Sequence, residues 1–150
     1  MQGRVDRISL SPGGIGAHAA AGISDLVEDA GRNGPLAVIA IDIPIGLPDT
    51  GRRQADLLVR KAVGPRWASV FMTPVRPALE AGDYPSAAAL SLRLAGEGIS
   101  RQAFALRAKI LQVDRWGRHT QHRVVELHPR PASRNWPVLP CAPASQPGPA

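Results

Sequence analysis

Residues 38–53 read VIAIDIPIGLPDTGRR, and this stretch decides the fold. Its first part is apolar and rich in β-branched residues, as in a central strand covered on both faces. One carboxylate, Asp42, interrupts the apolar run, and a turn rich in Pro and Gly follows. A charge in such a run is costly unless it is paired, binds a metal or lies at the strand's end. We therefore predict a buried strand over residues 36–43 with an acid near its end.

Helices are predicted on both sides of this strand. Residues 23–30 have an apolar face, and residues 51–65 combine an apolar stripe with a Gly-Pro stop. Residues 86–98 and 100–119 predict two further helices. The expected N-caps are Asp49 or Thr50, Ser86 and Ser100. The expected core-facing residues are Ala55, Leu58, Val59 and Ala62 in the second helix and Leu106, Ile110 and Val113 in the last.

The two ends of the chain differ from its middle. Residues 1–22 carry five glycines and no regular period, which predicts an irregular lead-in. Residues 129–150 contain seven prolines and no acid, so we expect a disordered proline-rich tail over 130–150. Residues 23–129 are then expected to form one partial α/β domain, with a short second strand in HRVVELHP, residues 122–129.

Composition narrows the class of protein. The 150 residues suffice for one domain, and a net charge of +6 favours a polyanionic partner such as nucleic acid, although a GC-rich genome explains the same bias. Cys141 stands alone, so an intrachain disulfide is excluded and a reducing cytoplasm is expected. No apolar run approaches the roughly 20 residues that span a membrane, so no membrane partner is expected. The sequence leaves the oligomeric state open.

Two acids are candidates for chemistry. Asp42 and Glu126 are each the single carboxylate of an apolar strand beside a proline-bearing turn, and we expect the two strands to share a sheet. Acids at adjacent strand ends repel each other, and a bound Mg²⁺ or Mn²⁺ relieves that repulsion. Such a site can support phosphodiester hydrolysis. Spacing alone favours the alternative, in which Asp42 caps a turn and Glu126 faces solvent from an edge strand.

The remaining polar groups have simpler interpretations. Asp114 ends the helical stretch KILQVD; it either approaches the same region or, as we expect, pairs on the surface with Lys109 or Arg115. The histidines near residue 120 lack the spacing of a zinc set. The stretch RWGRHTQHR, residues 115–123, is typical of a solvated basic segment, and it can also contact phosphate with Trp116 available for stacking.

Four blocks of sequence together resemble one family. They are AIDIPIGLPDTGRRQAD (40–56), SVFMTPVRPALEAGDYPSA (69–87), GISRQAFALRAKILQVD (98–114) and VVELHP (124–129). In order and spacing they resemble domain of unknown function 429, whose members are described as predicted RNase H-like nucleases. The resemblance covers residues 36–129 and implies an RNase H-like α/β fold, a mixed sheet flanked by helices, with clustered carboxylates that bind Mg²⁺ or Mn²⁺.

The resemblance also assigns residues. Asp42 and Glu126 would be catalytic metal ligands, and Asp114, which matches a further family position, would be a third candidate metal ligand. Substrate-binding arginines near these acids, which would steady the phosphate, are Arg52, Arg53 and Arg76. The function implied is metal-dependent nuclease activity on nucleic acid.

The chain departs from the family at both ends. Members begin with a strand ending in Asp-Gly, but Asp6 lacks both the apolar run and the glycine, and Arg130 replaces a usual acid after VVELHP. We therefore expect an incomplete domain, truncated at both ends, and a frameshift near residue 129 is one hypothesis for the tail. Weakened or lost activity would follow. The alternatives are a non-catalytic module that binds nucleic acid or protein, and a gene fragment without function.

Overall fold

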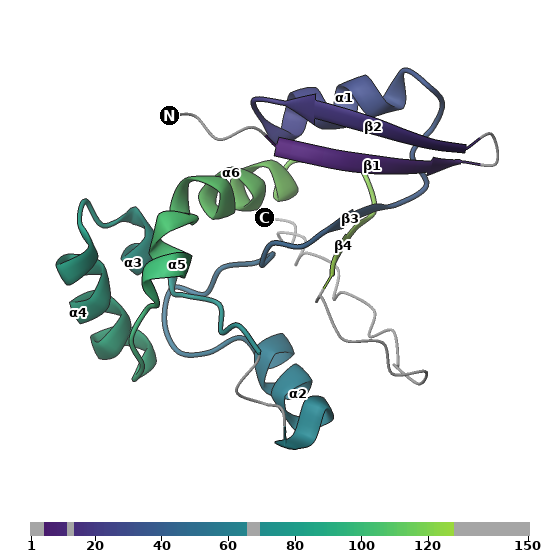
Figure 1. Cartoon of the computed structure of the whole chain (residues 1–150). Coiled ribbons are helices and arrows are strands. Elements are labelled where there is room, and N and C mark those ends of the chain that lie inside the picture. The colour runs from purple at the N-terminus through teal and green to yellow at the C-terminus, as the bar shows by residue number, and fades with distance from the viewer. Residues whose placement is uncertain (1–4, 12–13, 66–69, 128–150) are drawn as a thin grey trace, which may run out of the picture. The chain divides into compact units, whose positions relative to one another are not determined.

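The computed structural model describes residues 5–11, 14–65 and 70–127, and the expected tail over 130–150 lies outside them (Figure 1). The chain divides into two compact units. We call Met1–Ile43 with Arg115–Ala150 the strand unit, and Pro44–Asp114 the helical unit. In the described residues, no helix combines the length and the apolar character needed to cross a membrane.

A β-hairpin opens the strand unit. Strands β1 (Val5–Ser11) and β2 (Gly14–Ala20) pair antiparallel, from Val5 opposite Ala20 to Ser11 opposite Gly14. The prediction of an irregular lead-in is therefore wrong for these residues. Two of the glycines that suggested it, Gly14 and Gly16, lie in β2, where Gly14 takes a φ of 132° that few other residues adopt. The ladder consists of hydrogen bonds between backbone groups, which do not depend on the side chains of the paired residues.

Helix α1 (Ile23–Gly31) forms as predicted from its apolar spacing. It lies beside the hairpin (Figure 1). Its buried residues recur at helical intervals and supply much of the core of this unit. They are Ile23, Leu26, Val27 and Ala30. On the other face, Asp29 Oδ2 and His18 Nδ1 lie 2.6 Å apart, a hydrogen bond that joins α1 to β2.

A second sheet consists of β3 (Ile39–Ile41) and β4 (Val124–Glu126), which pair in parallel. The expectation that the two strands share a sheet is confirmed, and so is a mixed α/β architecture. Strand β3 is shorter than the strand predicted over residues 36–43. It is not covered on both faces, since Ala40 is exposed. Among the described strands, β1 and β2 form a sheet of their own, separate from this pair.

The helical unit contains α2 (Gln54–Val63), α3 (Arg76–Glu80), α4 (Tyr84–Ala95), α5 (Arg101–Ala105) and most of α6 (Arg107–Gly117). The single helix predicted over 100–119 is thus two helices with a break at Leu106. Packing of α3 on α4 and of α4 on α5 builds the core. Its largest fully buried side chains are Val75, Leu79 and Ile110.

Two of the predicted caps are wrong and one is confirmed. Ser100 Oγ accepts a hydrogen bond from Ala103 N at 3.0 Å and caps α5 as expected. Asp83, not Ser86, caps α4, because its carboxylate accepts from Ser86 N at 2.8 Å. Helix α2 begins after Arg53, and no side chain caps it.

The predicted buried faces also changed. In α2 the predicted stripe is largely exposed, with Leu58 at 42%, and the buried residue is Asp56. In the last helices Ile110 and Val113 are buried as predicted, whereas Leu106 is 40% exposed at the break.

Candidate functional site

Asp42 and Glu126 lie at one edge of the parallel sheet. Glu126 is the last residue of β4 and pairs in register with Ile41, the last residue of β3, so Asp42 comes one residue beyond that pair. Leu127 N donates to Ile41 O at 2.8 Å and continues the ladder to the same edge. Parallel strands end at a common edge, so the pairing brings both acids to it. Asp42 is exposed and Glu126 is half-buried.

The chemistry of this edge suits a hard cation. Carboxylate oxygens are the ligands that Mg²⁺ prefers, and it is commonly held by one or two carboxylates together with water and substrate phosphate. Within residues 5–11, 14–65 and 70–127, no group of three or more His, Cys, Asp or Glu is arranged to hold a metal ion. The described edge therefore offers two acids, Asp42 and Glu126.

Asp114 is buried in the helical unit, with 2% of its surface exposed. Its Oδ1 accepts from Leu47 N at 3.2 Å, and its Oδ2 accepts from Arg76 Nη1 at 2.8 Å. The expected surface pairing is therefore wrong. Asp114 follows the buried Ile110 by four residues, which places it on the inward face of α6.

Arg76 contacts the loop at 47–49 through its side chain and its backbone. Besides its bond to Asp114, its Nε lies 3.5 Å from Asp49 Oδ1, and its backbone N donates to Pro48 O at 2.8 Å. The side-chain hydrogen bond to Asp114 raises the pKa of Arg76 above its ordinary value, against the lowering effect of burial. The guanidinium expected to bind substrate is instead engaged inside its own unit.

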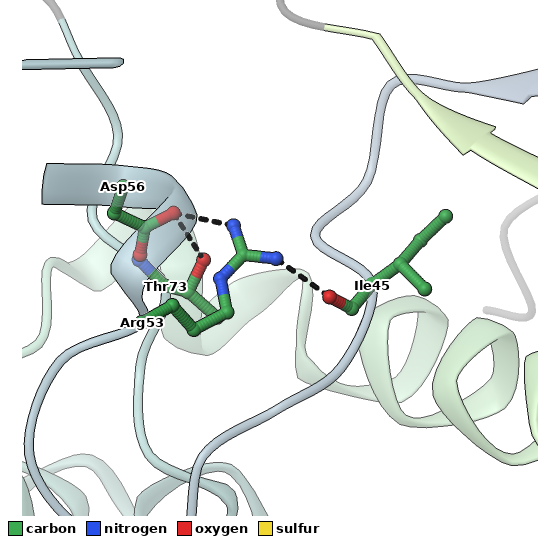
Figure 2. Close-up of polar contacts among 4 residues, drawn as sticks. All are labelled: Ile45, Arg53, Asp56 and Thr73. Carbon is green, nitrogen blue, oxygen red and sulfur yellow. Dashed lines mark hydrogen bonds and ion pairs between the residues drawn. The ribbon is translucent and has the colours of Figure 1, made fainter. Parts of the chain in front are cut away.

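A second buried carboxylate, Asp56, organises the start of α2 (Figure 2). It accepts hydrogen bonds from Thr73 N at 2.9 Å and from Thr73 Oγ1 at 3.2 Å, and it pairs with Arg53 Nη2. Arg53 Nη1 donates to Ile45 O at 2.6 Å. Together, Asp56 and Arg53 thus join three segments of the helical unit: the loop at 45, the first turn of α2 and the loop at 73.

Sequence reasoning missed Asp56 and Thr73 as structural residues. A signal was present, because Asp56 lies three residues after Arg53, a spacing that brings side chains together on a helix. Arg52, the third expected substrate residue, makes a more exposed contact, with its Nη2 3.1 Å from Glu97 Oε2. Of the three arginines, Arg52 has the most solvent-accessible side chain.

Comparison with known families gives one match. A family described as "Protein of unknown function (DUF429)" matches residues 6–147. The chain belongs to the DUF429 family. This DUF429 match is wider than the resemblance over residues 36–129; it takes in nearly all of the hairpin and much of the proline-rich segment. No curated protein and no solved structure matches the chain.

Proposed function

We propose that this DUF429 chain is a metal-dependent nuclease in which Asp42 and Glu126 hold Mg²⁺ or Mn²⁺. The observation that carries the proposal is the register of the parallel pair, with Glu126 opposite Ile41 and Asp42 next along the chain. The resemblance of AIDIPIG and VVELHP to blocks of predicted RNase H-like nucleases supports the same two acids. An RNase H-like fold is part of this proposal.

The two acids differ from the buried carboxylates in their surroundings. Across the described ranges of the chain, the Asp42 carboxylate makes no hydrogen bond or ion pair, and its side chain is exposed. It can therefore turn toward an ion without breaking an existing contact. Glu126 is the last residue of β4 and lies at the same edge of the sheet. A divalent ion there would supply activation of water and stabilisation of charge on the phosphate.

Asp114 has a structural role in this proposal. Both of its oxygens accept hydrogen bonds inside the helical unit, and metal binding would require it to give up Leu47 N or Arg76. Separating the buried ion pair of Asp114 and Arg76 would cost several kcal/mol. We therefore assign Asp114 and Arg76 to the stability of the loop at 47–49, and we keep Arg52 as the candidate for phosphate contact.

A cleavage assay tests the proposal. Wild type, Asp42→Asn and Glu126→Gln are compared on single-stranded, duplex and RNA–DNA hybrid substrates with Mg²⁺ or Mn²⁺. We expect each substitution to lower the rate by orders of magnitude, because loss of a ligand removes several kcal/mol of transition-state stabilisation. Asp25→Asn, at an exposed acid of α1, is the matched control and should leave the rate unchanged. Equal rates in wild type and Asp42→Asn would reject the assignment.

A non-catalytic nucleic-acid-binding module is the second candidate. The basic stretch 115–123 favours it. This function predicts affinity that falls with added salt and is indifferent to a chelator. Cleavage that requires Mg²⁺ or Mn²⁺ would reject it.

A further inference from the structure

The strand unit contains a groove of about 550 Å³ beside α1. One wall comes from α1 and the residues after it, including Val27 and Leu36. The other comes from the end of α6 and the turn after it, including Trp116, Gln121 and His122. The lining is mostly apolar with a few polar groups, a composition typical of small-molecule sites.

We propose that this groove binds a base of single-stranded nucleic acid, stacked on the Trp116 ring. Trp116 is half-buried and lines the groove. Aromatic side chains bind bases by stacking with little dependence on sequence. Ser24, Gln121 and His122 also line the groove and carry donors and acceptors suited to a base edge.

Charge complementarity argues for a nucleic acid over a neutral ligand. The segment 115–123 that carries Trp116 contains three arginines, two histidines and no acid. Glu28 lies on the opposite wall, where it is exposed and 3.8 Å from Arg32. Phosphates are repelled by Glu28 and attracted by the 115–123 segment, so the backbone of the ligand is expected along that segment, with the base turned inward.

The groove is separate from the metal edge. Its residues Leu36 and His122 precede β3 and β4, whereas Asp42 and Glu126 lie at the far ends of the same strands. Three residues of strand span about 10 Å. Base binding should therefore need no metal. This inference rests on the proposed function only for the choice of nucleic acid as ligand.

Fluorescence anisotropy of the full chain tests the groove without cleavage. The probe is a fluorescein-labelled single-stranded oligothymidine, with an oligouridine and a duplex of equal length for comparison. The protein carries Asp42→Asn, and binding is measured with and without EDTA. We expect Trp116→Ala to raise Kd about tenfold and Trp116→Phe to leave it within about threefold, because Phe still stacks. The duplex should bind more weakly than either single strand.

A second variant keeps the test independent of the loss of Trp116. Gly31 ends α1 and lines the groove, and a Cβ added there meets no atom within 4 Å outside its chain neighbours and the helix's own backbone, so Gly31→Leu adds bulk where the first added carbon has room. We expect it to raise Kd about as much as Trp116→Ala, because it narrows the site. Gly98→Leu is the matched control in the helical unit and should leave Kd unchanged.

The outcomes separate the two proposals. Unchanged Kd in both Trp116→Ala and Gly31→Leu, with binding that still falls with salt, would show phosphate contact alone and overturn the groove site. Binding abolished by EDTA would overturn its independence from metal. If Trp116→Ala does not fold, Gly31→Leu decides. Groove-dependent binding together with no cleavage by the wild type would uphold the groove and reject the nuclease.

Discussion

Arg76 Nη1 donates to Asp114 Oδ2 across 2.8 Å inside the helical unit. The side chain of Asp114 is 1% exposed and that of Arg76 is 15% exposed, so water screens this ion pair little. The pair joins α6 to the first residue of α3. The hydrogen bond from Leu47 N to Asp114 Oδ1 also joins α6 to the loop that follows β3. An acid predicted to be at the surface thus holds three segments together.

We expect Asp114→Asn to destabilise the protein strongly. The substitution keeps the size of the side chain but removes the buried charge that pairs with Arg76 and leaves it the exposed carboxylate of Asp49, which should lower the free energy of unfolding by about 3 kcal/mol. Urea unfolding measures this change. Glu97→Gln breaks the exposed pair with Arg52 and is the matched control, expected to cost about 0.5 kcal/mol. Equal losses in the two variants would contradict the burial of the Asp114 pair.

The contacts of Asp56 with Thr73 and Arg53 predict which face of α2 is buried. Thr73→Val removes one hydrogen bond to a buried carboxylate and should cost about 1–2 kcal/mol. Asp56→Ala also leaves Arg53 uncompensated and should cost more. Leu58→Ala, on the exposed face, should cost less than either. If urea unfolding shows a larger loss in the free energy of unfolding for Leu58→Ala, the apolar stripe predicted from the sequence is the buried face of α2.

The cap of α4 predicts an acid-dependent loss of stability. The hydrogen bond from Ser86 N, followed by that from Ser86 Oγ, lowers the pKa of Asp83 below its model-peptide value of 3.8. A carboxyl with a lowered folded pKa stabilises the fold above its unfolded pKa, and this contribution is lost as pH falls through the folded value. Thermal melts from pH 5 to pH 2 should show a smaller drop for Asp83→Asn than for wild type. Identical pH profiles would contradict the cap.

Cooperative unfolding separates a folded protein from a gene fragment. Both units bury apolar side chains, Leu26 in one and Leu79 and Ile110 in the other. We expect a sigmoidal thermal transition by circular dichroism. A gradual, featureless loss of signal would support the fragment.

Local sequence patterns predicted the elements that depend on contacts between residues close together in the sequence. The apolar spacing of residues 23–30 is sufficient for α1, because its four buried side chains share one face. Ser100 caps α5 through a contact three residues away. The pairing of β3 with β4 was also anticipated, since each is a short apolar run ending at an acid.

Other features depend on partners that local patterns do not reveal. Asp56 is buried because Thr73, seventeen residues later, supplies two donors, so the polar residue replaces the apolar stripe as the buried face of α2. Asp114 meets Leu47 from sixty-seven residues away. The hairpin was missed because β2 consists mainly of glycine and alanine, which lack a strand-like composition, while its ladder with β1 is formed by the backbone.

The central claim is that Asp42 and Glu126 together hold a divalent metal ion. Titration of the full chain with Mn²⁺, followed by the loss of the free-ion electron paramagnetic resonance signal, measures this directly. We predict that wild type binds Mn²⁺ and that Asp42→Asn and Glu126→Gln each weaken binding at least about tenfold, since each removes a charged ligand. Asp114→Asn, where it remains folded, should bind as wild type does. Equal Mn²⁺ affinity in wild type, Asp42→Asn and Glu126→Gln would contradict the account.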